Sequence, residues 1–179
     1  MKLLVIALEN FQDLELVGFL ATVKRAKIFE KISYLNLDQT TALGQFEIVK
    51  LATKKKLNYE NYDAIYIPGG RAAQQLRKDS KTLEIIKYFL ENKKWVFAIC
   101  DAPNAMYETG LINGYKFVGY PIANQQKPKD FFVNKPVVVS KNLITAKSAE
   151  YAVKLGLKAV EKLTNKELAQ IVWKAHSGN

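Results

Sequence analysis

The single cysteine of the chain, Cys100, stands where an apolar segment ends and a helix is expected to begin. Residues 95–100 have the sequence WVFAIC, which is typical of a buried strand, and Asp101, Ala102 and Pro103 follow. A strand, a tight turn and a helix in this order form a nucleophile elbow, in which the turn holds the side chain above the sheet. Unpaired N–H groups and the dipole of the next helix favour a thiolate, so we expect the pKa of Cys100 to lie below that of a free thiol. The alternative is a cysteine buried in a core strand, since free cysteine is among the most buried residue types.

Two glycines, Gly69 and Gly70, end a second apolar segment in a similar way. Residues 62–70 have the sequence YDAIYIPGG, in which Pro68 stiffens the exit from the expected strand. Glycine lets the backbone approach a ligand closely, and inward-pointing N–H groups are what an oxyanion pocket requires. A simple tight turn explains the same residues without a ligand.

Glu15 is the third candidate, because it stands among Leu14, Leu16 and Val17 near the start of an expected helix whose other charges are mostly basic. One interpretation is an ordinary first-turn acid that the helix dipole favours, as we expect for Asp13. The other is a partly buried, protonated carboxyl that donates a hydrogen bond to a thiolate. The residues alone favour the first interpretation.

Expected strands and helices alternate along almost the whole chain, an order typical of an α/β fold with a mainly parallel central sheet. Apolar or alternating segments predict strands at residues 2–8, 31–37, 46–52, 62–67, 95–100, 115–120, 136–140 and 142–146. Amphipathic periodicity predicts helices at residues 14–26, 80–94, 104–112, 148–163 and 165–175, and a Pro- and Lys-rich loop occupies 121–136. Ligands of such folds bind beyond the carboxyl ends of the strands, which is where Gly69, Gly70 and Cys100 fall.

Length and composition fit one domain over residues 1–179, and the 49% of hydrophobic residues is enough for a substantial core. The N-terminal apolar run is short and lacks a small-residue cleavage site, so we expect a buried first strand and not a signal peptide. No stretch approaches the about 18 apolar residues that span a membrane. A single cysteine forms no internal disulfide, which fits a reducing compartment, and we expect the cytoplasm.

The net charge of +10 is compatible with an acidic partner or with nucleic acid. The basic residues are scattered along the chain, however, and no stacking aromatics are interleaved with them in a recognisable motif. A lysine-rich solvated surface is the simpler interpretation. Nucleic-acid binding is therefore not expected to be the main role.

The order and spacing of four blocks resemble the DJ-1/PfpI (ThiJ) family of the class I glutamine amidotransferase-like superfamily. The blocks are YDAIYIPGG at 62–70, WVFAICDAP at 95–103, GLINGYKFVGYP at 110–121 and NLITA at 142–146 before a long helix. The resemblance extends from residue 2 to residue 163, nearly the whole chain. It implies a flavodoxin-like three-layer sandwich, a homodimer and a reactive cysteine at the elbow.

The resemblance also assigns site residues. It places the reactive cysteine at Cys100 and its acidic partner at Glu15, within FQDLELVG. The paired glycines of the family correspond to Gly69 and Gly70, and the backbone N–H of Asp101 completes the oxyanion pocket.

Among the departures from the family pattern, two positions bear on the site. Several members have histidine directly after the cysteine, where this chain has Asp101, and others have histidine before the proline of the third block, where it has Tyr120, a possible substrate contact. The only histidine, His176, is expected in an exposed tail, unless that tail or a neighbouring subunit brings it to the site. Protease activity is therefore not expected. The Asp101 carboxylate would raise the pKa of Cys100 if it points inward, or it caps the next helix.

No metal or cofactor is expected. One cysteine and one histidine do not supply the ligand cluster that zinc requires. The sequence also contains no phosphate loop of the Walker type and no dinucleotide fingerprint.

Two functions use the same features. In the first, Cys100 attacks the aldehyde carbon of a small 2-oxoaldehyde such as methylglyoxal, and Glu15 moves a proton between the carbons to give a hydroxy acid. The resemblance implies such glyoxalase or deglycase activity. In the second, Cys100 is oxidised to a sulfinic acid in a non-catalytic oxidative-stress protein. A weaker third interpretation is a basic chaperone or RNA-associated module, whose binding falls steeply with salt.

Overall fold

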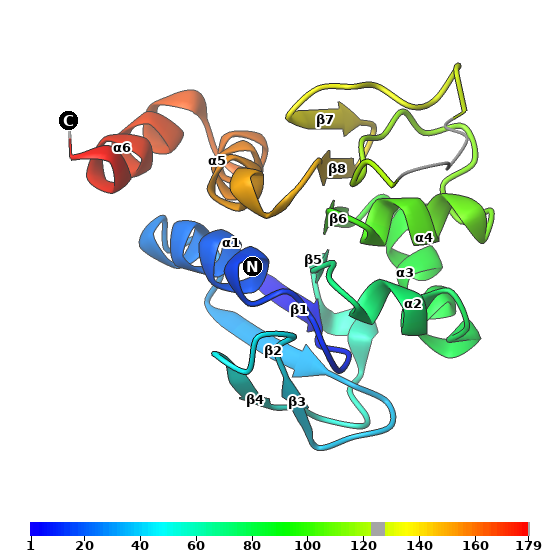
Figure 1. The fold of residues 1–179 in the computed structure, drawn as a ribbon. Coiled ribbons are helices and arrows are strands. Elements are labelled where there is room, and N and C mark those ends of the chain that lie inside the picture. Colours follow the sequence, from blue (N-terminus) through cyan, green and yellow to red (C-terminus); the bar gives the residue numbers. More distant parts are fainter. Residues whose placement is uncertain (123–127, 179) are drawn as a thin grey trace.

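The computed structural model of the chain describes residues 1–122 and 128–178. A six-stranded sheet lies at its centre, with the order β2-β1-β5-β6-β8-β7 (Figure 1). The strands are β1 (Lys2–Ile6), β2 (Lys31–Leu35), β5 (Ala64–Ile67), β6 (Trp95–Ile99), β7 (Val137–Ser140) and β8 (Leu143–Ala146). All pair in parallel except β7, which pairs antiparallel with β8 at one edge. Counted along the chain, the parallel strands have the order 2-1-3-4-5 of a flavodoxin-like sheet. The predicted α/β fold with a mainly parallel central sheet is confirmed.

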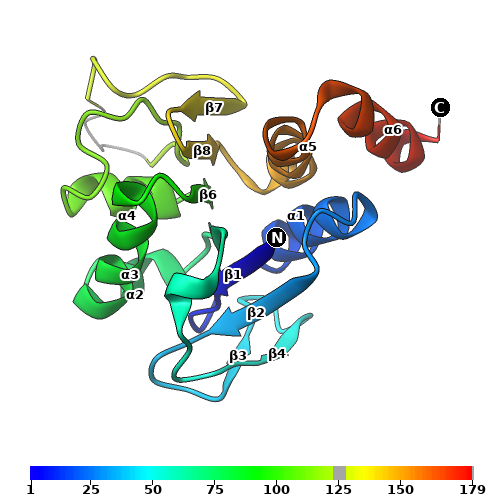
Figure 2. The ribbon, with the colours of Figure 1, turned by 180° about the vertical axis from the view of Figure 1, so that it is seen from behind.

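Helices cover both faces of the sheet (Figures 1 and 2). One face carries α1 (Asp13–Arg25) and α5 (Ala152–Leu163), and α6 (Lys166–Ser177) packs against α5. The other face carries α2 (Ala72–Leu76), α3 (Ser80–Glu91) and α4 (Ala102–Glu108). Two short 3-10 helices, η1 (Tyr59–Asn61) and η2 (Ala149–Tyr151), lie before β5 and α5.

The central strands are buried on both faces, which explains their continuous apolar sequences. Leu4 in β1 and Phe97 in β6 are fully buried. Phe19 of α1 stacks on Tyr66 of β5, with the ring centroids 4.0 Å apart, and this contact ties α1 to the sheet. Glu15 precedes Phe19 by four residues and therefore lies on the same, buried face of α1.

Residues 46–52 do not form the predicted single strand. Instead β3 (Thr41–Leu43) and β4 (Lys50–Ala52) pair as a separate antiparallel sheet. The carboxylate of Asp13 accepts the backbone N–H groups of Phe46, Ile48 and Val49 at 3.0, 3.1 and 2.8 Å. These donors are thus satisfied by a side chain and not by a strand ladder. Asp13 lies in the first turn of α1, as expected, but it is also buried and holds this turn, a role that the helix dipole does not explain.

The strand predicted at residues 115–120 is also absent from the described part of the chain, where this segment forms only an isolated bridge. Its N–H groups have other partners. Val118 donates to Thr145 Oγ1 at 3.0 Å, and Tyr120 donates to the Cys100 carbonyl at 2.7 Å. These bonds bring the segment to the carboxyl end of β6.

The five predicted helices are observed, with shifted ends, as α1, α3, α4, α5 and α6. The sequence does not predict the helix α2, because its five residues carry too little periodicity. The predicted loop at 121–136 contains residues 123–127, which lie outside the described residues. None of the described helices has the length and the apolar content that crossing a bilayer requires.

Candidate active site

Cys100 occupies the turn between β6 and α4, at the carboxyl end of a central strand (Figure 1). Its φ is 62°, a left-handed conformation that costs a residue with a Cβ atom about 1–2 kcal/mol. Its N–H still donates to the Ala146 carbonyl of β8 at 2.9 Å, and Pro103 lies in the first turn of α4. The chain therefore bends sharply at Cys100, and the largely buried thiol lies against a cavity.

Glu15 reaches the elbow from α1 and is fully buried. Its Oε2 accepts the N–H of Gly69 at 2.7 Å, and its backbone carbonyl accepts the Tyr66 hydroxyl at 2.9 Å. Its Oε1 is buried and has no hydrogen-bond partner among the described residues. The carboxyl is thus fixed at one oxygen while the other remains available.

Burial raises the pKa of Glu15 from 4.5 to about 7. The neighbouring Cys100 side chain and the Gly69 N–H lower this pKa, and the charge of Asp101 raises it further. Near neutral pH, Glu15 therefore exchanges a proton. This pKa is consistent with the second interpretation of Glu15, the buried and protonated carboxyl.

Gly69 and Gly70 follow β5 and lie against the elbow. A Cβ atom on Gly69 would lie 2.7 Å from the Ile99 carbonyl and 2.8 Å from Cys100 Cβ, so only glycine fits there. We expected the Gly69 N–H to stabilise an oxyanion. It donates to Glu15 instead, so this glycine positions the carboxyl. Gly70, with φ at 84°, turns its N–H toward the Cys100 thiol.

Burial raises the pKa of Cys100, and so does the ionised form of Glu15 beside it. The backbone N–H groups of Gly70 and Asp101 lower this pKa, as the elbow geometry predicts, but their effect is smaller. The expectation of a thiol pKa below that of a free thiol is therefore wrong, because burial is the largest cause of the rise and ionised Glu15 adds to it. Protonation of Glu15 removes the repulsion, so the pair accommodates one negative charge more easily than two.

Asp101 adopts neither of the two expected arrangements. Its side chain makes no capping hydrogen bond to α4. Its two oxygens accept bonds from Arg77 Nη1 and Nη2 at 2.8 and 2.9 Å, and Asn104 Nδ2 donates to Oδ1 at 3.0 Å. The carboxylate is thus neutralised beside the elbow. Arg77 could not be found from the sequence, because no motif links it to Asp101.

A cavity of about 610 Å³ opens over the thiol. Its lining comes from α1, the turn between β3 and β4, the segments after β5 and β6, and the region around η2: Gln12, Glu15, Gln45, Phe46, Gly70, Arg71, Gln74, Cys100, Asp101, Tyr120, Ile122, Ser148, Ala149 and Glu150. The structure therefore brings Cys100, Glu15, Gly70, Asp101 and Tyr120 together at one place. Gln45 and Phe46 could not be found from the sequence, since the Asp13 contact carries their turn to the cavity.

His176 does not line this cavity. It lies in the last turn of α6 and is half-buried, so the expectation of an exposed tail histidine is wrong. Its Nε2 atom is buried and has no hydrogen-bond partner among the described residues.

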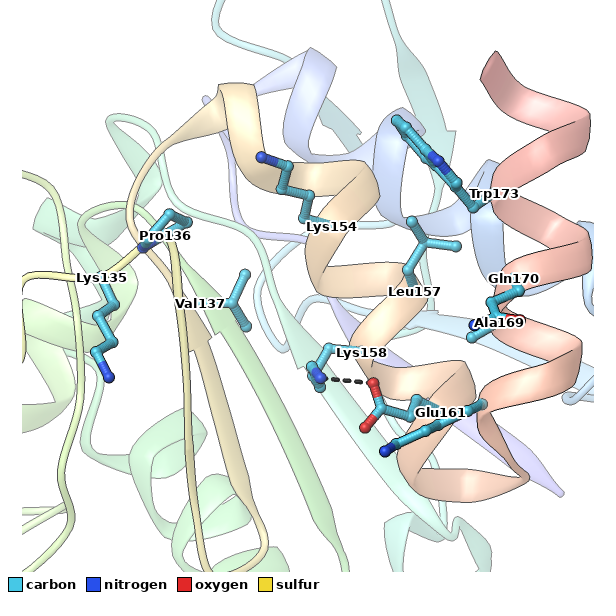
Figure 3. Close-up of a pocket in the computed structure, with 11 residues that line it drawn as sticks. Lys135, Pro136, Val137, Lys154, Leu157, Lys158, Glu161, Ala169, Gln170 and Trp173 are labelled. Atoms are coloured by element: carbon cyan, nitrogen blue, oxygen red, sulfur yellow. Dashed lines mark hydrogen bonds and ion pairs between the residues drawn. The ribbon is translucent and has the colours of Figure 1, made fainter. Parts of the chain in front are cut away.

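A second cavity of about 550 Å³ lies between the start of β7 and the helices α5 and α6 (Figure 3). Figure 3 shows Lys154 and Leu157 on α5, Trp173 on α6, and an ion pair between Lys158 and Glu161. None of the residues predicted for the site lines it. Those predicted site residues that line one of these two cavities therefore line the first.

The fold and the elbow define a class of protein, a flavodoxin-like α/β sandwich with a cysteine in the turn after a central parallel strand. The sequence matches the DJ-1/PfpI family over residues 1–162. The chain belongs to the DJ-1/PfpI family.

Individual relatives agree with this assignment. The Mycoplasma genitalium protein MG029 is 34% identical over 152 residues, which are 83% of this chain and 80% of that protein. The deglycase PH1704 of Pyrococcus horikoshii is 28% identical over 121 residues, with 68% and 73% of the two chains covered. Among solved structures, oxidised Toxoplasma gondii DJ-1 superposes with a TM-score of 0.86 at 28% identity, covering 98% of this chain and 96% of that one.

Proposed function

We propose that the protein is a cofactor-independent enzyme for small 2-oxoaldehydes, of the glyoxalase or deglycase type. The observation that carries the proposal is the meeting of Cys100, the N–H groups of Gly70 and Asp101, and the buried carboxyl of Glu15 at one cavity. The similarity to a relative named as a deglycase supports the reaction class. His176, the only histidine of the chain, does not line the cavity, which argues against a cysteine protease with a histidine base.

In the first step, the Cys100 thiolate attacks the aldehyde carbon of methylglyoxal. A C–S bond forms, and the electrons of the C=O π bond move to the oxygen. The N–H groups of Gly70 and Asp101 stabilise this oxyanion, which takes the proton of Glu15 to give a hemithioacetal and leaves Glu15 ionised. A protonated Glu15 favours the step, because it does not repel the thiolate.

In the second step, ionised Glu15 removes the proton from the former aldehyde carbon, and the ketone oxygen takes a proton as an enediol forms. Glu15 then delivers its proton to the second carbon, and the first carbon regains a C=O bond as its hydroxyl proton leaves. The product is a thioester of lactate. Water cleaves the C–S bond, which releases lactate and the thiolate, so one water is consumed and no oxidant is required.

A pKa of about 7 suits Glu15 to this exchange, since acid and base forms are both populated near neutral pH. The side chains of Phe46, Tyr120 and Ile122 line the cavity and would contact the substrate, as expected for Tyr120. We place the activity in the cytoplasm, where reducing conditions keep Cys100 available.

The test is methylglyoxal turnover by the purified chain without glutathione or metal, with lactate detected as the product. We expect Cys100→Ser and Glu15→Gln each to lower kcat/KM at least about a hundredfold, because each removes a group that takes part in proton or covalent transfer. Glu84→Gln removes an exposed carboxylate on α3 and serves as the control. Full activity in either site variant contradicts the mechanism.

A redox role is the second candidate, favoured by the unpartnered Oε1 of Glu15. As a protonated group, this oxygen would donate a hydrogen bond to a Cys100 sulfinate, and the N–H groups of Gly70 and Asp101 would hold the same anion. The solved DJ-1 relative is an oxidised form. Mass spectrometry after mild peroxide separates the two functions. A Cys100 that gains two oxygens in a protein without turnover supports the sensor, whereas a thiol that stays reduced removes it.

We also propose a homodimer through an apolar patch beside the site. The patch consists of Leu14 and Val17 on α1 and Phe46 and Ile48 in the adjoining turn, which are 57%, 47%, 61% and 78% exposed. Asp13 fixes this turn against the start of α1, so we expect the four side chains to share one surface. Large contiguous apolar surfaces of this kind mark interfaces.

Sedimentation equilibrium tests the dimer. We expect the wild-type chain to sediment as a dimer and the Val17→Asp/Ile48→Asp variant as a folded monomer, because each buried carboxylate would lack a partner. Ile171→Asp, which changes an exposed apolar residue on α6, should leave the dimer intact. A monomeric wild type, or a double variant that remains dimeric, contradicts this interface.

A further inference from the structure

A cluster of charged side chains lies directly beside the elbow, with Arg77 at its centre. The guanidinium forms two parallel bonds to the Asp101 carboxylate, at 2.8 and 2.9 Å. Its Nε donates to Glu108 on α4 at 2.5 Å, and its Nη1 also donates to the Ala73 carbonyl at 3.1 Å. The Arg77 and Asp101 side chains are only 18% and 11% exposed, so solvent screens this pair weakly. Arg77 is thus held rigidly by three groups.

Asp101 is an unfavourable neighbour for a thiolate. It follows Cys100 directly and is largely buried, and two like charges in a site of low dielectric disfavour each other. Its charge reaches the catalytic pair, since it contributes to the raised pKa of Glu15. The site nevertheless uses the backbone N–H at this position, which faces the thiol and does not depend on the side chain. A thiolate at Cys100 therefore requires that the backbone N–H of Asp101 stays in place while the charge of its carboxylate is neutralised.

We propose that Arg77 is a positioning residue for the elbow, which turns the Asp101 carboxylate away from Cys100 and neutralises it so that a negative charge can be carried by the sulfur. The bidentate geometry fixes both the direction and the distance of the carboxylate, which a single-point contact does not. This inference rests on the proposed role of Cys100 as a nucleophile.

The hydrogen bonds around Arg77 and Asp101 continue to the segment that carries Tyr120, which lines the cavity. Asn104 Nδ2 donates to Asp101 Oδ1 and to the Tyr120 carbonyl, both at 3.0 Å. The Tyr120 N–H in turn donates to the Cys100 carbonyl at 2.7 Å. Arg77 therefore holds Asp101, and Asp101 holds through Asn104 the segment that carries Tyr120. Loss of Arg77 is expected to make the elbow less rigid and to leave the negative charge of Asp101 without its Arg77 partner beside Cys100.

The titration of Cys100 depends on every charged or titratable group that faces the elbow. These groups are Glu15 from α1, Tyr66 from β5, Arg71 and Arg77 next to α2, Asp101 and Glu108 around α4, Tyr120, and Glu150 from η2. Arg77 is the group among them that bonds both to Asp101 and to Glu108. Its removal therefore changes the net charge behind the thiol by one unit and leaves two carboxylates without this partner.

The experiment is the rate of Cys100 alkylation by iodoacetamide as a function of pH. We expect Arg77→Gln to raise the apparent thiol pKa by about one to two pH units and to slow alkylation at pH 7 about tenfold or more. Arg77→Lys keeps the charge and should recover part of the shift. Arg77→Gln/Asp101→Asn removes both charges and should return the profile to near that of the wild type. Lys78→Gln, the loss of an equal charge from the adjacent residue, is the matched control.

The outcomes separate the inference from the proposed function. A wild-type thiol whose pH profile does not change in Glu15→Gln overturns the proposed function, and this inference falls with it. A wild-type thiol whose profile changes in Glu15→Gln but not in Arg77→Gln overturns only the role of Arg77. If the double variant has the same raised thiol pKa as Arg77→Gln, the charge of Arg77 is not the cause and its role is structural. If Arg77→Gln does not fold, Asp101→Asn decides, since a raised thiol pKa in that variant contradicts the proposal.

Discussion

Glu15→Gln is expected to abolish a fall of about 3 kcal/mol in the free energy of unfolding that the wild type shows as the pH rises from 4.5 to about 7. The folded protein keeps the Glu15 proton up to about pH 7, whereas the unfolded chain releases it near pH 4.5. Between these values unfolding releases a proton, so a higher pH favours the unfolded chain. The stabilising contribution is fully present below the lower value and lost above the higher one. Glutamine has no proton to lose at this position.

Urea unfolding of the two proteins across this pH range makes the comparison. The difference between the two curves isolates Glu15, because the other titrating groups are shared. Glu84→Gln, which removes an exposed carboxylate, should follow the wild-type curve. If wild type and Glu15→Gln keep a constant difference from acid to neutral pH, Glu15 does not hold its proton in the folded protein.

Gly69→Ala is expected to destabilise the fold by about 3 kcal/mol, the upper end of the cost of overpacking a buried site. The new Cβ atom would lie 2.7 Å from the Ile99 carbonyl, 2.8 Å from Cys100 Cβ and 3.0 Å from Glu15 Oε2. Two of these three neighbours are fixed by the elbow backbone and cannot move as a flexible side chain does. The substitution therefore presses on the elbow and on the carboxyl at once.

Gly114→Ala is the control for this prediction. Gly114 has φ at 78°, and a Cβ atom added there would have no heavy atom within 4 Å, so alanine meets only the backbone strain of about 1 kcal/mol. Thermal and urea unfolding should show that Gly69→Ala is much less stable than Gly114→Ala. Equal stabilities of the two variants would mean that β5 and the elbow do not approach as closely as described.

The sequence was sufficient to predict the strands that carry the elbow. Apolar runs around residues 2–8, 62–67 and 95–100 predicted buried strands, because strands covered on both faces need apolar side chains at every position. The alternation with amphipathic helices then implied a parallel sheet, and the carboxyl ends of parallel strands meet at one edge. The order of the elements was therefore enough to place Gly69, Gly70 and Cys100 near one another.

Weak or short-range patterns were misleading. The alternating residues predicted strands at 46–52 and 115–120, but in the described structure only residues 50–52 of the first segment form a strand, and the second segment forms none. In the first case the Asp13 carboxylate takes the N–H groups that a strand would pair, and in the second Thr145 and the Cys100 carbonyl do so. Such donors and acceptors come from residues distant in sequence, so periodicity cannot reveal them.

The residues alone determined which groups could do chemistry: one thiol at a strand end, two glycines at another, and a carboxyl among apolar neighbours. Only the tertiary structure decided how they share charge. Folding assigned the Gly69 N–H to Glu15, turned Asp101 toward Arg77 and buried the Glu15–Cys100 pair. The physical reason is that a pKa depends on desolvation and on charges a few ångströms away, and these are set by packing between segments that the sequence separates.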